Sequence, residues 1–137
     1  MTELRVTAGS IEFEARFERE KAPLTCAAFE TLLPFSNVLV QARWSGEAAW
    51  VPLGSLSLPV PPENATSYPA AGQLLFYPGG LSETELLFPY GPTCFASRRG
   101  QLAGNHFLTL TTGLEELSEL GRRVLQEGAQ PIWIGRA

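Results

Sequence analysis

Two titratable side chains stand inside the most apolar stretches of this chain. Glu85 opens the run Glu-Leu-Leu-Phe, and His106, the only histidine, follows Asn105 in another apolar segment. An unpaired buried carboxylate is costly, so a glutamate in such a run indicates either a compensated group or a functional site. A carboxyl and an imidazole that share a cavity are a common starting point for proton transfer. This pair predicts acid–base chemistry on a small molecule.

Arg43 and Trp44 stand at the end of an expected strand, beside the turn sequence Ser-Gly-Glu. A guanidinium can bind a carboxylate through two parallel hydrogen bonds. Arg43 is therefore the expected partner of Glu85, or else the anchor for an anionic ligand. The alternative is a surface arginine that packs across Trp44.

Two tyrosines and an asparagine complete the candidate site. Tyr77 and Tyr90 each border a Pro or Gly turn, where a ring can line a pocket, and Tyr90 and Asn105 would orient a ligand. The alternatives are structural: packed tyrosines, a core histidine bonded to one backbone carbonyl, and a solvated glutamate at a strand start. The candidate ligand-binding residues are Arg43, Trp44, Tyr77, Glu85, Tyr90, Asn105 and His106.

The charge pattern and the apolar runs argue against nucleic acid and membrane partners. The net charge is −4, and basic residues stand next to each other only at 98–99 and 122–123. Nucleic-acid binding requires a concentrated basic face. No apolar run approaches the ~20 residues of a membrane-spanning helix, and the opening Met-Thr-Glu-Leu-Arg-Val lacks the features of a signal peptide. We therefore expect a cytoplasmic protein.

The composition excludes several kinds of catalytic centre. Aspartate is absent from the sequence, so a Ser-His-Asp triad is impossible. Cys26 and Cys94 lie far apart and outside any Cys-x-x-Cys pair, which with a single histidine argues against a metal centre. We expect two free thiols that pack as small apolar side chains, and neither metal nor cofactor.

Hydrophobic periodicity predicts the elements that must position these residues. Between residues 10 and 19, apolar and charged side chains alternate strictly, which is typical of a strand with one solvated face. Pro23 begins a helix that Pro34 ends, and Thr112 and Glu115 form a capping box for a second helix that ends at Gly128. The other expected strands cover residues 4–8, 37–44, 48–53, 73–77, 83–88, 93–97, 105–111 and 130–135.

These elements predict one mainly β domain over residues 1–137. About eight strands with an early and a late helix favour a closed barrel whose ends the helices cover, since closure removes exposed strand edges. Residues 57–72 contain four prolines and should form a loop or an edge passage, because proline cannot donate to a β ladder. A loop of this length in a compact domain is commonly functional.

Six short motifs follow one another in order: Ala-Pro-Leu-Thr from residue 22, Arg-Trp-Ser-Gly-Glu-Ala from 43, Glu-Asn-Ala-Thr-Ser-Tyr-Pro from 63, Tyr-Pro-Gly-Gly from 77, Tyr-Gly from 90 and Gly-Asn-His-Phe from 104. In this order they resemble a family of small bacterial cyclophilin-like proteins of unknown function. The resemblance covers nearly the whole chain. It implies an eight-stranded cyclophilin-like barrel with two helices, and it supplies no activity.

Three functions are compatible with these observations. The first is binding of a small, anionic metabolite in a pocket at a barrel mouth; as an enzyme, the protein would perform acid–base work on a carboxylate- or amide-bearing compound. The second is a self-associating module without catalysis, since Trp44, Trp50, Phe88 and Trp133 cannot all be core in so small a barrel; a homo-oligomer is expected.

The third function is prolyl isomerisation, which the resemblance brings with it. True cyclophilins are prolyl isomerases whose site joins a Phe-His-Arg strand to a Phe-x-x-Gln-Gly-Gly strand. Residues 42–47 here read Ala-Arg-Trp-Ser-Gly-Glu instead. Arg43 could take the carbonyl-binding role, but its apolar and glutamine companions are missing, so this function ranks last.

Overall fold

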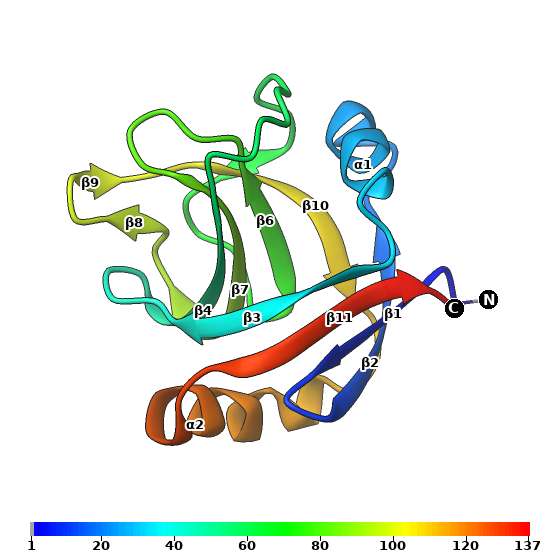
Figure 1. Ribbon diagram of the computed structural model, residues 1–137, viewed down its shortest axis with the longest axis vertical. Coiled ribbons are helices and arrows are strands. Elements are labelled where there is room, and N and C mark those ends of the chain that lie inside the picture. The colour runs from blue at the N-terminus through cyan, green and yellow to red at the C-terminus, as the bar shows by residue number, and fades with distance from the viewer. Residues whose placement is uncertain (1) are drawn as a thin grey trace.

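The computed structural model describes residues 2–137 as a β structure flanked by two helices (Figure 1). The helices are α1 (Pro23–Glu30) and α2 (Leu117–Glu127), the second preceded by a 3-10 turn at Leu114–Glu116. Neither helix is long and apolar enough to cross a membrane. The strands are β1 (Leu4–Ala8), β2 (Ile11–Phe17), β3 (Phe35–Gln41), β4 (Gly46–Gly54), β5 (Ala65–Thr66), β6 (Gln73–Tyr77), β7 (Thr84–Thr93), β8 (Ala96–Ser97), β9 (Gly100–Gln101), β10 (Gly104–Leu110) and β11 (Gln130–Arg136).

Eight of these strands close into an antiparallel barrel. Their order around the wall is β2, β1, β11, β3, β4, β7, β6 and β10, and pairing of β10 with β2 completes the ring. The short strand β5 pairs with the start of β10 beside that junction. The expected mainly β, closed barrel with two helices is therefore confirmed, and closure leaves no long strand edge unpaired.

The interior of the barrel is an aromatic and aliphatic core. Phe13 and Phe88 meet edge to face with ring centroids 6.2 Å apart, and Phe76 meets Phe107 at 6.4 Å. Helix α1 adds Phe29, whose ring centroid lies 5.0 Å from that of Phe107. Helix α2 packs its own apolar side chains against the same core from the opposite side of the barrel (Figure 1). The two helices thus cover apolar ends that strands alone would expose.

A second apolar cluster lies on the outer face of the wall formed by β4, β6 and β7. Leu75 and Leu87 belong to it, whereas their chain neighbours Phe76 and Phe88 belong to the interior core. Residues 94–102, which contain β8 and β9, fold over this outer face and bury Phe95 and Leu102. We call this segment the arm; Figure 1 shows its β8–β9 hairpin reaching beyond the barrel wall.

Three local expectations from the sequence are wrong. The strand expected at 93–97 is divided, because β7 continues to Thr93 and the two-residue strand β8 forms a ladder only with β9. The strand expected to reach residue 44 ends at Gln41, so Arg43 lies in the following turn. The capping box does not form: Gly113 with φ 81° precedes the 3-10 turn, and the Thr112 hydroxyl accepts the backbone N–H of Glu14.

Both cysteines are free thiols, as expected. Cys26 is buried in α1, and its thiol donates to the carbonyl of Phe107 at 3.3 Å. Burial raises the pKa of the Cys26 thiol to about 11. This thiol is therefore protonated at neutral pH and serves packing rather than nucleophilic chemistry.

Candidate functional site

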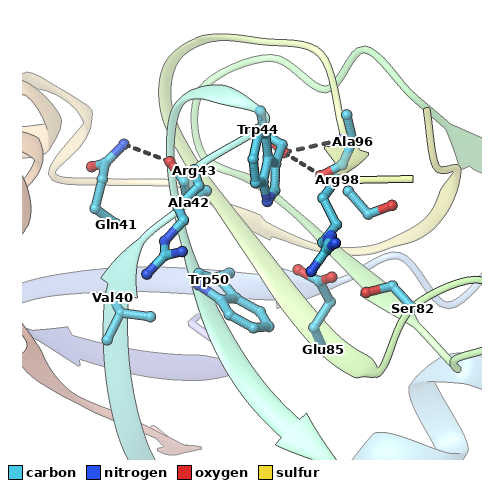
Figure 2. A pocket seen from close by; sticks show the side chains of 12 residues that line it. Val40, Gln41, Ala42, Arg43, Trp44, Trp50, Ser82, Glu85, Ala96 and Arg98 are labelled. Carbon is cyan, nitrogen blue, oxygen red and sulfur yellow. Dashed lines mark hydrogen bonds between the residues drawn. The ribbon is translucent and has the colours of Figure 1, made fainter. Parts of the chain in front are cut away.

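A cavity of about 480 Å³ lies between the barrel wall and the arm (Figure 2). The wall contributes Val40, Trp50 and Glu85, and the arm contributes the segment from Ala96 to Arg98. The turn between β3 and β4 supplies Arg43 and Trp44 at the rim. The volume of the cavity falls within the range of about 300–1,000 Å³ that is typical of small-molecule sites.

The cavity lies on the outer face of the barrel. Successive side chains of a strand point to opposite faces, so Leu86 of β7 enters the interior core while Glu85 points the other way. In β4, Val51 likewise belongs to the interior, and Trp50 packs against the outer cluster. The cavity is therefore not at the expected barrel mouth. The arm creates it, and only the first part of the arm falls within the strand expected at 93–97.

A backbone hydrogen bond and the hydroxyls of two serines hold the arm in place. The Ser45 hydroxyl accepts the amide of Ala96 at 3.0 Å and donates to its carbonyl at 3.2 Å. On the far side of the arm, the Phe95 amide donates to the carbonyl of Ser67 at 2.7 Å, and the Ser67 hydroxyl donates to the carbonyl of Leu102, also at 2.7 Å. The roof of the cavity is thus fixed at both ends.

Glu85 is a buried carboxyl without a protein partner. The residue is 6% exposed, and within residues 2–137 its carboxyl forms neither a hydrogen bond nor an ion pair. Among these residues no fully buried side-chain oxygen lacks a hydrogen bond, so the carboxyl oxygens of Glu85 are open to the cavity that the residue lines. Burial raises the pKa of this carboxyl to about 8, and the nearby negative charge of Glu83 adds to the rise. At neutral pH Glu85 is therefore mostly protonated, so it can donate as well as accept a hydrogen bond in the cavity.

The two arginines of the cavity differ in their relation to Glu85. The expected pair of Arg43 with Glu85 does not form, and Figure 2 shows the Arg43 side chain directed toward Val40 instead. Arg98 reaches down from the arm toward Glu85 (Figure 2), but no ion pair joins the two. In the described part of the chain, neither guanidinium has a carboxylate partner, so both remain able to bind an anion.

The tryptophans supply the aromatic surface of the cavity. Trp50 is half-buried in the floor, while Trp44 is 55% exposed at the rim. Val40 stands beside Trp50 on the neighbouring strand, since the two are cross-strand partners. This floor can bury the apolar body of a ligand, and the arginines can hold its charged end.

Tyr77 and Tyr90 support the cavity without lining it. The Tyr77 hydroxyl accepts the amide of Leu81 at 2.9 Å and so fixes the turn that carries Ser82 to the cavity wall. The Tyr90 hydroxyl donates to Oε1 of Gln41, a lining residue, at 2.7 Å. Burial raises the pKa of Tyr90, while its hydrogen bond with Gln41 acts in the opposite direction.

Asn105 lies away from the cavity and joins the Pro-rich loop to α1. Its amide nitrogen donates to the Thr25 hydroxyl at 3.0 Å and to the carbonyl of Pro61 at 2.9 Å. Its amide oxygen accepts the backbone N–H of Glu63 at 3.2 Å. The Glu63 carboxylate in turn accepts the Thr25 hydroxyl at 2.7 Å. Asn105 is thus saturated by structural hydrogen bonds, and the expectation that it contacts a ligand in this cavity is wrong.

His106 also lies outside the cavity. A β-bulge at Phe107 breaks the alternation of β10, so His106 shares the outer face with Thr109 rather than the interior with Leu108. Its Nε2 donates to the Thr109 hydroxyl at 2.7 Å, because that hydroxyl already donates its one proton to Glu18 at 2.5 Å. Burial lowers the pKa of His106, with Glu18 opposing it. The expected Glu85–His106 proton-transfer pair is not present, since β6 lies between their strands.

Several cavity residues were missed at the sequence level. Arg98 belongs to an Arg-Arg-Gly segment that resembles an ordinary turn, and Trp50 was expected in the core or an interface. The usable signal for Arg98 was a pair of basic residues at the tip of a short polar hairpin. Among residues 2–137, no cluster of three or more His, Cys, Asp or Glu side chains is arranged to hold a metal ion.

The chain matches, over residues 4–135, the family model described as "Protein of unknown function (DUF3830)". Its structure is similar to that of McbB in complex with tryptophan, with 16% identity, a TM-score of 0.73 and coverage of 98% of this chain but only 44% of McbB. It is also similar to the solution structure of the hypothetical protein AF2241 from Archaeoglobus fulgidus, with 20% identity, a TM-score of 0.59 and coverage of 99% and 95%. At these identities the similarity concerns the fold alone. No curated protein matches the chain.

Proposed function

We propose that this chain, which belongs to the DUF3830 family of proteins of unknown function, binds a small organic anion with an apolar body in the cavity beneath the arm. The observation that carries the proposal is Glu85, a buried and unpaired carboxyl that opens into this cavity. A chain that needed only stability would gain by replacing such a group with an apolar or amide side chain. Strongly perturbed carboxyls in clefts are typical of functional sites.

The surroundings of Glu85 support the choice of ligand class. Arg43 and Arg98 place two positive charges at the rim, where they attract an anionic group. Trp50 and Val40 provide an apolar floor, and Trp44 can fold over an apolar body at the entrance. McbB, a protein of the same fold, has been determined with tryptophan, so an indole compound is a reasonable first probe of this cavity.

We expect indole-3-propanoate to bind, and to bind more weakly when Arg98 is replaced by alanine. The Kd should rise about tenfold, which corresponds to the free energy that one hydrogen bond to a charged group contributes. Arg99→Ala is the matched control, because Arg99 is the adjacent exposed arginine and does not line this cavity. The measurement is isothermal titration at low salt. Equal losses in both variants, or no binding to the natural protein, would contradict the proposal.

We also propose that the barrel is of the cyclophilin-like type, that the protein is bacterial and that it is located in the cytoplasm. Self-association is the alternative function: Trp133 and Val38 are 37% and 44% exposed on the paired strands β11 and β3, and sedimentation velocity over a range of concentrations would detect it.

A further inference from the structure

We propose that the ligand is an α-amino acid with an apolar or aromatic side chain, bound with its carboxylate on Arg98 and its ammonium on Glu85. This inference rests on the proposed function and specifies the ligand of the same cavity. It arises from the way in which the guanidinium of Arg98 and the ionisable carboxyl of Glu85 face one another in the cavity.

Arg98 and Glu85 approach the cavity from different elements. Arg98 comes from the arm and Glu85 from β7, and their side chains point toward one another (Figure 2). They nevertheless form no ion pair. An α-amino acid carries its carboxylate and its ammonium on one carbon atom. It can therefore meet both groups at once, with the two charges in complementary order.

The carboxyl of Glu85 requires a ligand group that can compensate its negative charge when it ionises. A simple anion would satisfy the arginines and could accept one hydrogen bond from the protonated carboxyl of Glu85, but it would supply no charge that compensates the carboxylate form. An ammonium supplies three donors and a compensating charge. The surrounding charges favour a cation at this end of the cavity, since Glu83 adds negative charge near Glu85. Arg43, the other charged lining residue, is directed toward Val40 (Figure 2).

The rest of the cavity lining is mostly apolar and sets the kind of side chain that the ligand can carry. Trp50 and Val40 are cross-strand partners on the wall, and Ala42 and Ala96 border the same cavity. These surfaces offer dispersion contacts and no charge, so they favour an apolar or aromatic side chain over a polar one. The charged end and the apolar end of the site thus correspond to the two ends of a hydrophobic amino acid.

Three indole compounds that differ only in their charged groups test the inference. Tryptophan carries both charges, indole-3-propanoate lacks the ammonium, and tryptamine lacks the carboxylate. We expect tryptophan to bind the natural protein about tenfold more tightly than either of the others. In Glu85→Gln, tryptophan should no longer bind more tightly than indole-3-propanoate. In Arg98→Ala, tryptophan should no longer bind more tightly than tryptamine. Leucine and 4-methylpentanoate repeat the comparison with an aliphatic side chain.

The controls separate this inference from the function on which it rests. Glu12→Gln removes an exposed carboxylate on β2 that does not line the cavity and should change the advantage of tryptophan over indole-3-propanoate by less than about threefold, as a screened surface charge does. If indole-3-propanoate binds as tightly as tryptophan, or if Glu85→Gln keeps the advantage, the amino-acid inference is overturned while the anion site stands. If none of the compounds binds, both proposals fall.

Discussion

Replacing Glu85 with glutamine is expected to stabilise the protein, with a gain that grows as the pH rises. Glutamine keeps the size of the side chain and removes the charge. The folded-state pKa of Glu85 is raised from 4.5 to about 8. Well below pH 4.5 the carboxyl is neutral in both the folded and the unfolded state, so its ionisation does not lower the free energy of unfolding. As the pH rises toward 8, the unfolded chain loses this proton while the folded chain keeps it, so stability falls.

At pH 8 the gain from Glu85→Gln should be about 4 kcal/mol, whereas at pH 5 it should be below about 1 kcal/mol. Urea unfolding at the two pH values measures both. Glu12→Gln is the matched control, since Glu12 is an exposed strand residue on β2, and its effect should stay within about 0.5 kcal/mol at either pH. A destabilising or pH-independent effect of Glu85→Gln would show that the carboxyl is paired in solution.

Truncation of Phe95 to alanine is expected to destabilise the protein by about 3–4 kcal/mol, as is typical for a fully buried phenylalanine. Phe95 is wholly buried, and its ring meets that of Tyr77 edge to face with centroids 5.8 Å apart. The residue is the apolar anchor of the arm. Its loss should therefore release the roof of the cavity before the barrel itself unfolds.

Hydrogen exchange distinguishes release of the arm from a general loss of stability. The amide of Ala96 donates to the Ser45 hydroxyl in the natural protein, and in Phe95→Ala it should exchange much faster. The amides of β1 and β11 should still exchange only through global unfolding, with a free energy of exchange equal to the free energy of unfolding of the variant. Tyr68→Ala is the control, since Tyr68 is 67% exposed and its truncation should cost less than about 1 kcal/mol. Unchanged protection at Ala96 would mean that Phe95 does not hold the arm.

The barrel could be predicted from the sequence because its strands carry a clear periodic pattern. In β2 the apolar side chains alternate with charged ones, so one face had to be buried. In β7 the residues from Thr84 to Pro89 are all buried. A run that is apolar on both faces does not reveal which face is the interior. The outer location of Glu85 depends on the arm, whose two-residue strands carry too little pattern to detect.

The candidate site was predicted in part. Arg43, Trp44 and Glu85 line one cavity, and Tyr77 and Tyr90 hold its walls, as hydroxyl bonds to Leu81 and Gln41 show. Strict alternation would put His106 on the same face as Leu108, in the interior. The extra residue at the Phe107 bulge reverses the side chains that follow it, so His106 and Leu108 lie on opposite faces. Asn105 was misplaced because its partners come from loop and helix residues that are distant in sequence.

The most direct test of whether the cavity holds an unpaired buried acid is a pH titration of the Glu85 carboxyl. Carbon-13 NMR monitors the titration, and the Glu85→Gln variant assigns the signal. We expect a midpoint near 8 in the protein alone, and a lower midpoint when tryptophan is added, because an ammonium favours the carboxylate. A midpoint near 4.5, the ordinary value for glutamate, would mean that Glu85 is solvated or paired with Arg98, and the case for this binding site would be lost.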